Sequence, residues 1–159
     1  SYLQLESGAS NFTSGDGGNI IIRAAQRFEL DGNGFPTGWT RVAAATQGGG
    51  RGGDILVEAP SILIDRATLF SRTRFGTGQQ GGITVRGGDM LLRNQGSLSS
   101  SAEGEKQGSF VLVDVKTLTM EDTGSLVSVA NSLSTGGAGP VTVLADRVLM
   151  TGSSYITTD

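Results

Sequence analysis

Residues 50–71, GRGGDILVEAPSILIDRATLFS, contain the pattern that decides the fold of this 159-residue chain. Glycines and one acidic residue precede a short apolar strand that begins at Ile55. The same strand, preceded by a glycine-bearing corner, recurs at intervals of 35, 28, 28 and 30 residues, with starts at Ile20, Ile55, Ile83, Val111 and Val141. Recurrence of one short segment at a nearly constant spacing predicts a repeat architecture.

Further apolar positions recur within each unit. A pair of apolar residues, two apart, follows seven residues after the start in four units: Ile62 and Ile64, Met90 and Leu92, Leu118 and Met120, Val148 and Met150. The first unit has the pair Phe28 and Leu30. A third apolar position is expected fifteen residues after the start, at Phe70, Leu98, Leu126 and Ile156, and at Val42 in the first unit. Each unit therefore predicts three short strands joined by Gly-, Ser-, Asn- and Asp-rich corners.

One such unit cannot fold alone. Its five or six inward aliphatic side chains contribute on the order of 10–15 kcal/mol, and ordering about 28 residues at roughly 1.5 kcal/mol each costs more. Stacking the units solves this, because each interior coil then pairs on both sides. We predict an all-β protein, a right-handed parallel β-helix (β-solenoid) with about 28 residues per coil and five to six coils. A β-sandwich or barrel is the alternative, but neither needs equal strand offsets in every unit.

The whole chain, residues 1–159, is expected to form a single solenoid segment. It has partial coils at both ends and an insertion at residues 31–38 that lengthens the first unit. Leu3 and Leu5 resemble the second apolar pair of a unit whose beginning is missing, so the chain is expected to be a piece of something longer. The inward face of the third strand stays undecided, although Arg72 and Arg74 cannot both point into a narrow apolar core.

The composition excludes several classes of function. The chain has no cysteine and no histidine, so disulfides, thiolate metal sites and Ser-His-Asp or Cys-His catalysis are impossible. A formal net charge of −3 gives no basic footprint for nucleic acid. No signal peptide and no apolar run long enough to cross a bilayer is present in the sequence. We expect no catalytic residues, no bound metal and no cofactor.

The residue types around the corner at residues 48–56 match two ligand-binding sequence motifs. Gly48, Gly50 and Gly53 match a dinucleotide fingerprint, but a strand follows them where that fingerprint needs a helix. Residues 49–56 match a calcium-binding nonapeptide, but the copies lie about 28 residues apart and not nine. The interpretation is therefore a structural corner, in which glycine supplies positive φ and Asn19 and Asp54 bond their own turn backbone.

The insertion is the most individual segment of the chain. It carries Phe35 and the single Trp39, whose aromatic faces suit a partner protein or a sugar ring. The alternative is that both side chains fold back onto the flank of the solenoid. A second site hypothesis places Asp54, Glu58 and Arg86 together on adjacent coils, as a β-helix polysaccharide lyase would require.

The unit, roughly G-G-x-I-x-V-x-A-x-x-L-x-L, resembles the repeat of filamentous-haemagglutinin-like exoproteins of two-partner secretion, in the form seen in cyanobacterial members. The similarity covers nearly the whole chain and is closest at residues 50–85 and 15–24. It implies a β-helical shaft, export through an outer-membrane secretion pore, and a secreted or cell-surface location in a Gram-negative-type bacterium. The Asn-Pro-Asn segment of the family's secretion domain is absent from this sequence.

These observations together predict a structural and adhesive shaft, without enzymatic activity. Its expected partners are further repeats of a longer chain or other copies, stacked end to end into extracellular filaments, and surface glycans. Nucleic acid is not expected as a partner. The alternatives are a carbohydrate-binding module that uses Trp39 and a polysaccharide lyase.

Overall fold

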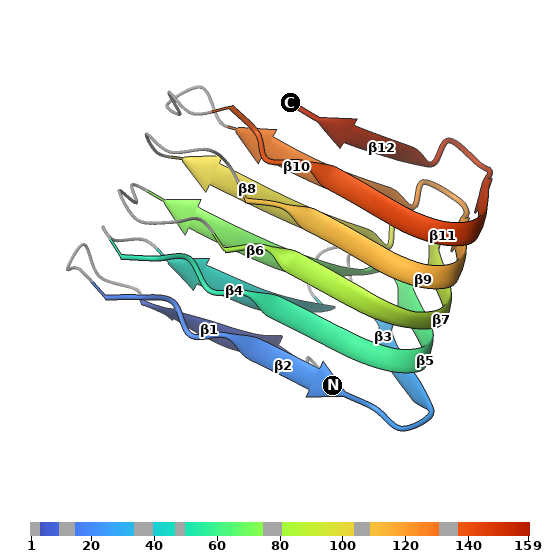
Figure 1. Cartoon of the computed structure of the whole chain (residues 1–159), viewed down its shortest axis with the longest axis horizontal. Coiled ribbons are helices and arrows are strands. Elements are labelled where there is room, and N and C mark those ends of the chain that lie inside the picture. Colours follow the sequence, from blue (N-terminus) through green and yellow to red (C-terminus); the bar gives the residue numbers. More distant parts are fainter. Residues whose placement is uncertain are drawn as a thin grey trace.

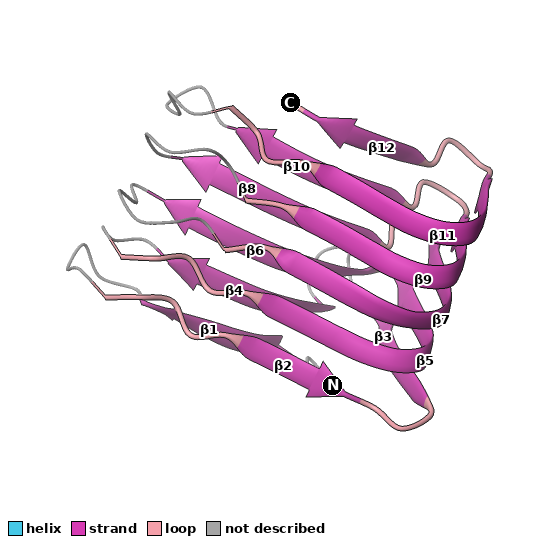
Figure 2. Cartoon of the chain, viewed as in Figure 1, coloured by secondary structure: helices cyan, strands magenta, loops and turns pink. Residues whose placement is uncertain are grey.

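The fold is built from strands and connecting turns alone. The computed structural model describes residues 15–33, 40–46, 50–74, 81–103, 109–130 and 137–159, together with the backbone of 4–9. Figure 2 shows strands joined by loops in these ranges, without a helix. The described part of the chain accordingly contains no helix that could span a membrane.

The strands form two parallel sheets that run the length of the stack. Sheet A contains, in spatial order, β1 (Gln4–Ala9), β4 (Thr40–Thr46), β6 (Ala67–Arg74), β8 (Ser97–Glu103), β10 (Ser125–Ala130) and β12 (Tyr155–Thr158). Sheet B contains β2 (Ile20–Arg23) and β3 (Arg27–Asp31), both paired with β5 (Ile55–Asp65), then β7 (Ile83–Arg93), β9 (Val111–Met120) and β11 (Val141–Met150). The chain passes from sheet B to sheet A and back in each coil, so the predicted β-solenoid is confirmed (Figure 1).

The coil count differs slightly from the prediction. The five sheet-B starts are separated by four steps, so the solenoid makes about four turns instead of five to six coils. The expectation counted the terminal fragments as coils. The assignment of Leu5 to the second strand of a unit is wrong, because β1 pairs with β4 and places Leu5 beside Val42 in sheet A.

The first two predicted strands of each unit are one continuous strand from β5 onward. The ladder between β5 and β7 pairs Ala59 with Gly87 and resumes at Ser61 with Asp89, skipping Pro60 and Gly88. The chain bends at this skipped position, where a proline without an N–H is tolerated because no ladder bond is needed. Only the first unit keeps two separate strands, β2 and β3.

Inward side chains stack in columns along the solenoid axis. Sheet B contributes four columns and sheet A one: Ile20–Ile55–Ile83–Val111–Val141, Ile22–Val57–Val85–Val113–Val143, Phe28–Ile62–Met90–Leu118–Val148, Leu30–Ile64–Leu92–Met120–Met150 and Val42–Leu69–Leu98–Leu126–Ile156. Their members in the middle coils are almost completely buried. These columns are the hydrophobic core.

The second unit departs from the predicted third position. Leu69, and not Phe70, stands beside Leu98, and it is fully buried. The connection from Asp65 to this strand is one residue shorter than the equivalent connection in the next coil, since Asp65 pairs with Arg93 while Thr68 pairs with Ser97. A one-residue shift reverses the face of every side chain in a strand.

The same shift decides the orientation of the two arginines of β6. Ala67, Leu69 and Ser71 alternate inward, so Arg72 and Arg74 point outward and are only partly buried. The third strand thus has an apolar inward position followed by small or hydroxyl-bearing ones. This resolves the parity that the sequence left undecided.

Candidate functional site on the outer surface

The glycine corner at residues 50–54 is a junction between coils. The Asp54 backbone N–H donates to Asn19 Oδ1 at 2.9 Å, and the Gly82 N–H donates to Asp54 Oδ1 at 2.9 Å. The side chains of Asn19 and Asp54 therefore bond the backbone of the next coil, and not their own turn as expected. The Asp54 carboxylate thus has a structural partner in the adjacent coil.

Glycine is required at this corner for close approach and not for positive φ. A Cβ on Gly52 would lie 2.5 Å from the backbone nitrogen of Gly81 and would collide with Thr73 Oγ1. The φ angles in the left-handed region belong instead to the turns between sheet B and sheet A, at Arg66, Asn94, Gln95, Asp122, Thr123, Gly152 and Ser153. The prediction that glycine supplies a positive φ at this corner is therefore wrong, and close packing of the backbone is the reason for glycine there.

The structure describes the insertion only as far as Asn33, and the described chain resumes at Thr40. Its first residues form a turn in which the Asn33 N–H donates to Asp31 Oδ1 at 2.8 Å. Phe35 and Trp39, the predicted contact residues, lie outside the described residues. Their role stays a prediction.

The proposed lyase residues occupy neighbouring coils, but they are joined by ion pairs. Glu58 Oε2 lies 2.5 Å from Arg23 Nε, and Glu58 Oε1 lies 3.9 Å from Arg86 on the other side. Asp54 instead pairs with Arg51 at 3.4 Å and accepts the bond from Gly82. Glu58 and Arg86 are thus brought together, whereas Asp54 belongs to the glycine corner four residues earlier.

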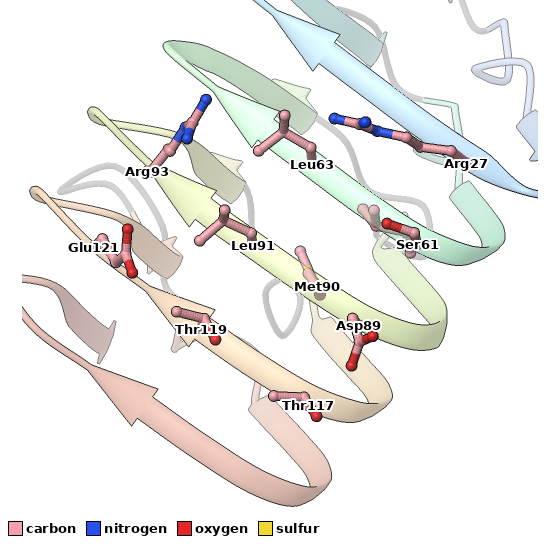
Figure 3. A pocket seen from close by; sticks show the side chains of 11 residues that line it. Arg27, Ser61, Leu63, Asp89, Met90, Leu91, Arg93, Thr117, Thr119 and Glu121 are labelled. Carbon is pink, nitrogen blue, oxygen red and sulfur yellow. The ribbon is translucent and has the colours of Figure 1, made fainter.

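A shallow depression of about 460 Å³ lies on the outer face of sheet B, beyond the bend (Figure 3). Leu63 and Leu91 stand beside each other in the ladder, and Thr119 continues the same column. Ser61, Asp89 and Thr117 form a parallel column nearer the bend. The rest of the lining comes from Arg27, Ile62, Met90, Arg93 and Glu121. We call this surface the outer groove.

The outer groove has an apolar strip with polar groups on both sides. The carboxylates of Asp89 and Glu121 form no ion pair and no side-chain hydrogen bond with another described residue. Arg27 pairs with Glu29 at 2.8 Å, and Arg93 pairs with Asp65 at 2.7 Å. Carboxylate and hydroxyl groups around an aliphatic strip suit a polar ligand that also has an apolar face.

Asp65 holds one rim of the outer groove in place. Burial raises the pKa of this carboxyl, but hydrogen bonds from Asn94 and Arg93 outweigh it, so the pKa lies below its ordinary value. The same contact raises the pKa of Arg93 through its hydrogen bond to Asp65. The pair is charged at neutral pH and ties two adjacent coils together.

A second buried acid links adjacent coils on sheet A. Glu103 is 8% exposed and contacts Arg72 at 3.0 Å and Arg74 at 2.8 Å. Burial raises the pKa of Glu103, and the hydrogen bond from Arg74 together with the charge of Arg72 lowers it further than burial raises it. Glu103 therefore stays ionised and bridges the outward arginines of the preceding coil.

Sequence reasoning missed the outer groove and both buried acids. The signal was present, since Asp65 and Arg93 are 28 residues apart, as are Leu63 and Leu91. Their outward positions recur with the same period as the core positions, but outward columns carry no single residue type. Within the described ranges no three acidic side chains gather closely enough to hold a metal ion.

The fold and outer surface define a β-solenoid repeat protein. No family model, no curated protein and no solved structure matches the chain. Any function must therefore be argued from the residues themselves.

Proposed function

We propose that this chain forms part of a structural shaft in a secreted or cell-surface protein, with a non-enzymatic, adhesive role. The observation that carries the proposal is the unbroken register of the coils, in which five inward columns continue through the stack. Each further coil of this kind extends the stack by about 4.8 Å. The architecture thus suits extension in one direction.

The outward ion pairs support the same proposal. Arg23–Glu58, Arg93–Asp65 and Arg74–Glu103 each join residues of adjacent coils. Such contacts join one coil to the next along the outside of the stack, as a stacked structural shaft requires. Export through an outer-membrane pore and location on a Gram-negative-type bacterium are part of the proposal and rest on the resemblance of the repeat.

The location is tested by cysteine labelling, because the chain contains no cysteine. Leu91→Cys places a thiol on the outer face, and Leu92→Cys places one in the core. We expect a membrane-impermeant maleimide to label Leu91→Cys on intact cells and to leave Leu92→Cys unlabelled until the protein is denatured. Labelling of Leu91→Cys only after lysis would contradict the surface location.

A second candidate function is glycan binding, favoured by the outer groove. The half-buried Leu91, with Leu63 buried beside it, offers an apolar surface to a sugar ring, and Asp89 and Glu121 offer carboxylates to its hydroxyls. Trp39 would add an aromatic face if the insertion takes part.

The glycan proposal is tested with Asp89→Asn and Trp39→Ala on an array of polysaccharides. We expect Asp89→Asn to weaken binding at least tenfold while the far-UV circular dichroism is unchanged, with Asp114→Asn as a control outside the groove. Loss of binding in Trp39→Ala alone would move the glycan site from the outer groove to the insertion. Equal binding by all variants would reject this candidate. Calcium-dependent formation of unsaturated products from a pectin-like substrate would replace both proposals with the lyase.

A further inference from the structure

The two cations that line the outer groove are each paired with a carboxylate outside it. Arg27 Nη2 lies 2.8 Å from Glu29 Oε2, and Arg93 Nε lies 2.7 Å from Asp65 Oδ2. Neither of these two acids belongs to the lining. The positive charge of the lining is therefore already compensated by acids of the protein itself.

The two acids of the lining are not compensated in this way. Asp89 is exposed and Glu121 is half-buried, and neither carboxylate forms an ion pair with another described residue. Glu121 attracts Arg93, but less strongly than Asp65 does, to which Arg93 donates its hydrogen bond. The lining thus offers a ligand two negative charges.

The two carboxylates lie at opposite ends of the groove. Asp89 pairs with Thr117 in the ladder, and Glu121 follows four residues after Thr117. Four residues along a strand and one strand spacing separate the two backbone positions by about 14 Å. Leu91 lies between them on the outer face (Figure 3). This separation is longer than one sugar ring, so a ligand that reaches both acids has to be a chain of sugars.

We propose that the outer groove binds a glycan with free amino groups, a chain of amino sugars of the chitosan type. One ammonium group lies at Asp89 and another at Glu121, and the C–H face of a sugar ring between them packs on Leu91. Charge complementarity carries this choice, because a hydrogen bond between an ammonium and a carboxylate is about twice as strong as a neutral one. The inference rests on glycan binding, the second candidate function, and names the class of glycan.

An acidic glycan fits the same lining less well. Its carboxylate or sulfate groups would face those of Asp89 and Glu121, and like charges repel. Lys116 at the bend and Arg147 beside Thr117 carry positive charge on this face, but neither belongs to the lining. An uncharged glycan would offer the two carboxylates only hydroxyl groups, which make weaker hydrogen bonds than ammonium groups do.

Titration calorimetry with a chitosan oligomer and its N-acetylated counterpart tests the proposal, because the two share ring and linkage and differ in charge. At about pH 5.5 the carboxylates are ionised and the sugar amines are protonated. We expect the chitosan oligomer to bind at least about tenfold more tightly than the acetylated oligomer and than free glucosamine. Equal binding of the two oligomers would overturn the inference and leave glycan binding intact. Binding of no glycan at all would overturn both.

Charge-removing variants locate the binding in the groove. Asp89→Asn and Glu121→Gln should each weaken binding of the chitosan oligomer at least about tenfold, with unchanged far-UV circular dichroism. Asp114→Asn removes the same charge from the same face outside the lining and should leave binding unchanged. Equal weakening by all three variants would show attraction to the net charge of −3 alone and would overturn the proposal. Oligolysine that binds as tightly as the chitosan oligomer would overturn it too, because oligolysine has no sugar ring to pack on Leu91.

Discussion

Leu91 and Leu92 provide a direct measure of the solenoid core, since they are identical neighbours on opposite faces of β7. Leu92 is fully buried between Ile64 and Met120 in its column. Truncation to alanine removes three carbon groups, at roughly 0.8 kcal/mol each, and a residual cavity adds about 1 kcal/mol at ~24 cal/mol per Å³. We therefore expect Leu92→Ala to reduce the free energy of unfolding by about 3 kcal/mol.

Leu91→Ala is the matched control. Its side chain is only half-buried on the outer face, so the expected loss is at most about 1 kcal/mol. Both values come from chemical denaturation followed by far-UV circular dichroism, with unchanged m-values required for a fair comparison. Equal losses for the two variants, or a larger loss for Leu91→Ala, would refute the assignment of inside and outside on which the whole account depends.

Three further outcomes follow from the same structure. Gly81→Ala should lower Tm strongly in thermal unfolding, because its Cβ would clash with the backbone of Gly53. Gly137→Ala is the control and should leave Tm unchanged, because nothing lies within 4 Å of its Cβ. Glu103→Gln should cost about 1.5–3 kcal/mol by denaturant titration, since it loses charged hydrogen bonds to two arginines. The pKa of Glu103 and that of Asp65 are lower in the folded protein than the ordinary values of 4.5 and 3.8, so the unfolded chain binds more protons near those values. Stability should therefore be full above about pH 5 and fall as the pH drops through the lowered values, and Glu103→Gln should flatten this dependence; a stability that rises on acidification would contradict the sign.

The core columns of sheet B could be predicted from sequence because the same apolar spacing recurs within each unit. Parallel stacking places one residue of each coil above its equivalent, so Ile55, Ile83 and Val111 had to recur at equal offsets. The spacing of the inward positions within each strand is fixed in this way, whereas the distance from one unit to the next varies between 28 and 35 residues without leaving the columns. The insertion after Asp31 did not disturb these columns, since it extends the connection between the sheets and not a strand.

The third strand could not be predicted to the same level because its register depends on a turn. Two residues, Arg66 and Ala67, lie between Asp65 and Thr68, whereas three residues, 94–96, lie between their ladder partners Arg93 and Ser97. A shorter turn shifts the strand by one residue and exchanges its faces. The apolar pattern could not show which of the two residues points inward, because Leu69 and Phe70 are adjacent and both apolar.

The outward positions obey the same period as the core but a weaker rule. An inward position accepts only a side chain that fills the column, whereas an outward position accepts any residue that its neighbours in adjacent coils tolerate. The outward column of Arg23, Glu58, Arg86 and Asp114 alternates in charge and then ends in Leu144. The alternation stops at β11, where Leu144 lies beside Asp114. An alternating charged column contains no apolar residue until its last member, so a search for apolar spacing could not find it, although it repeats with the same register as the core.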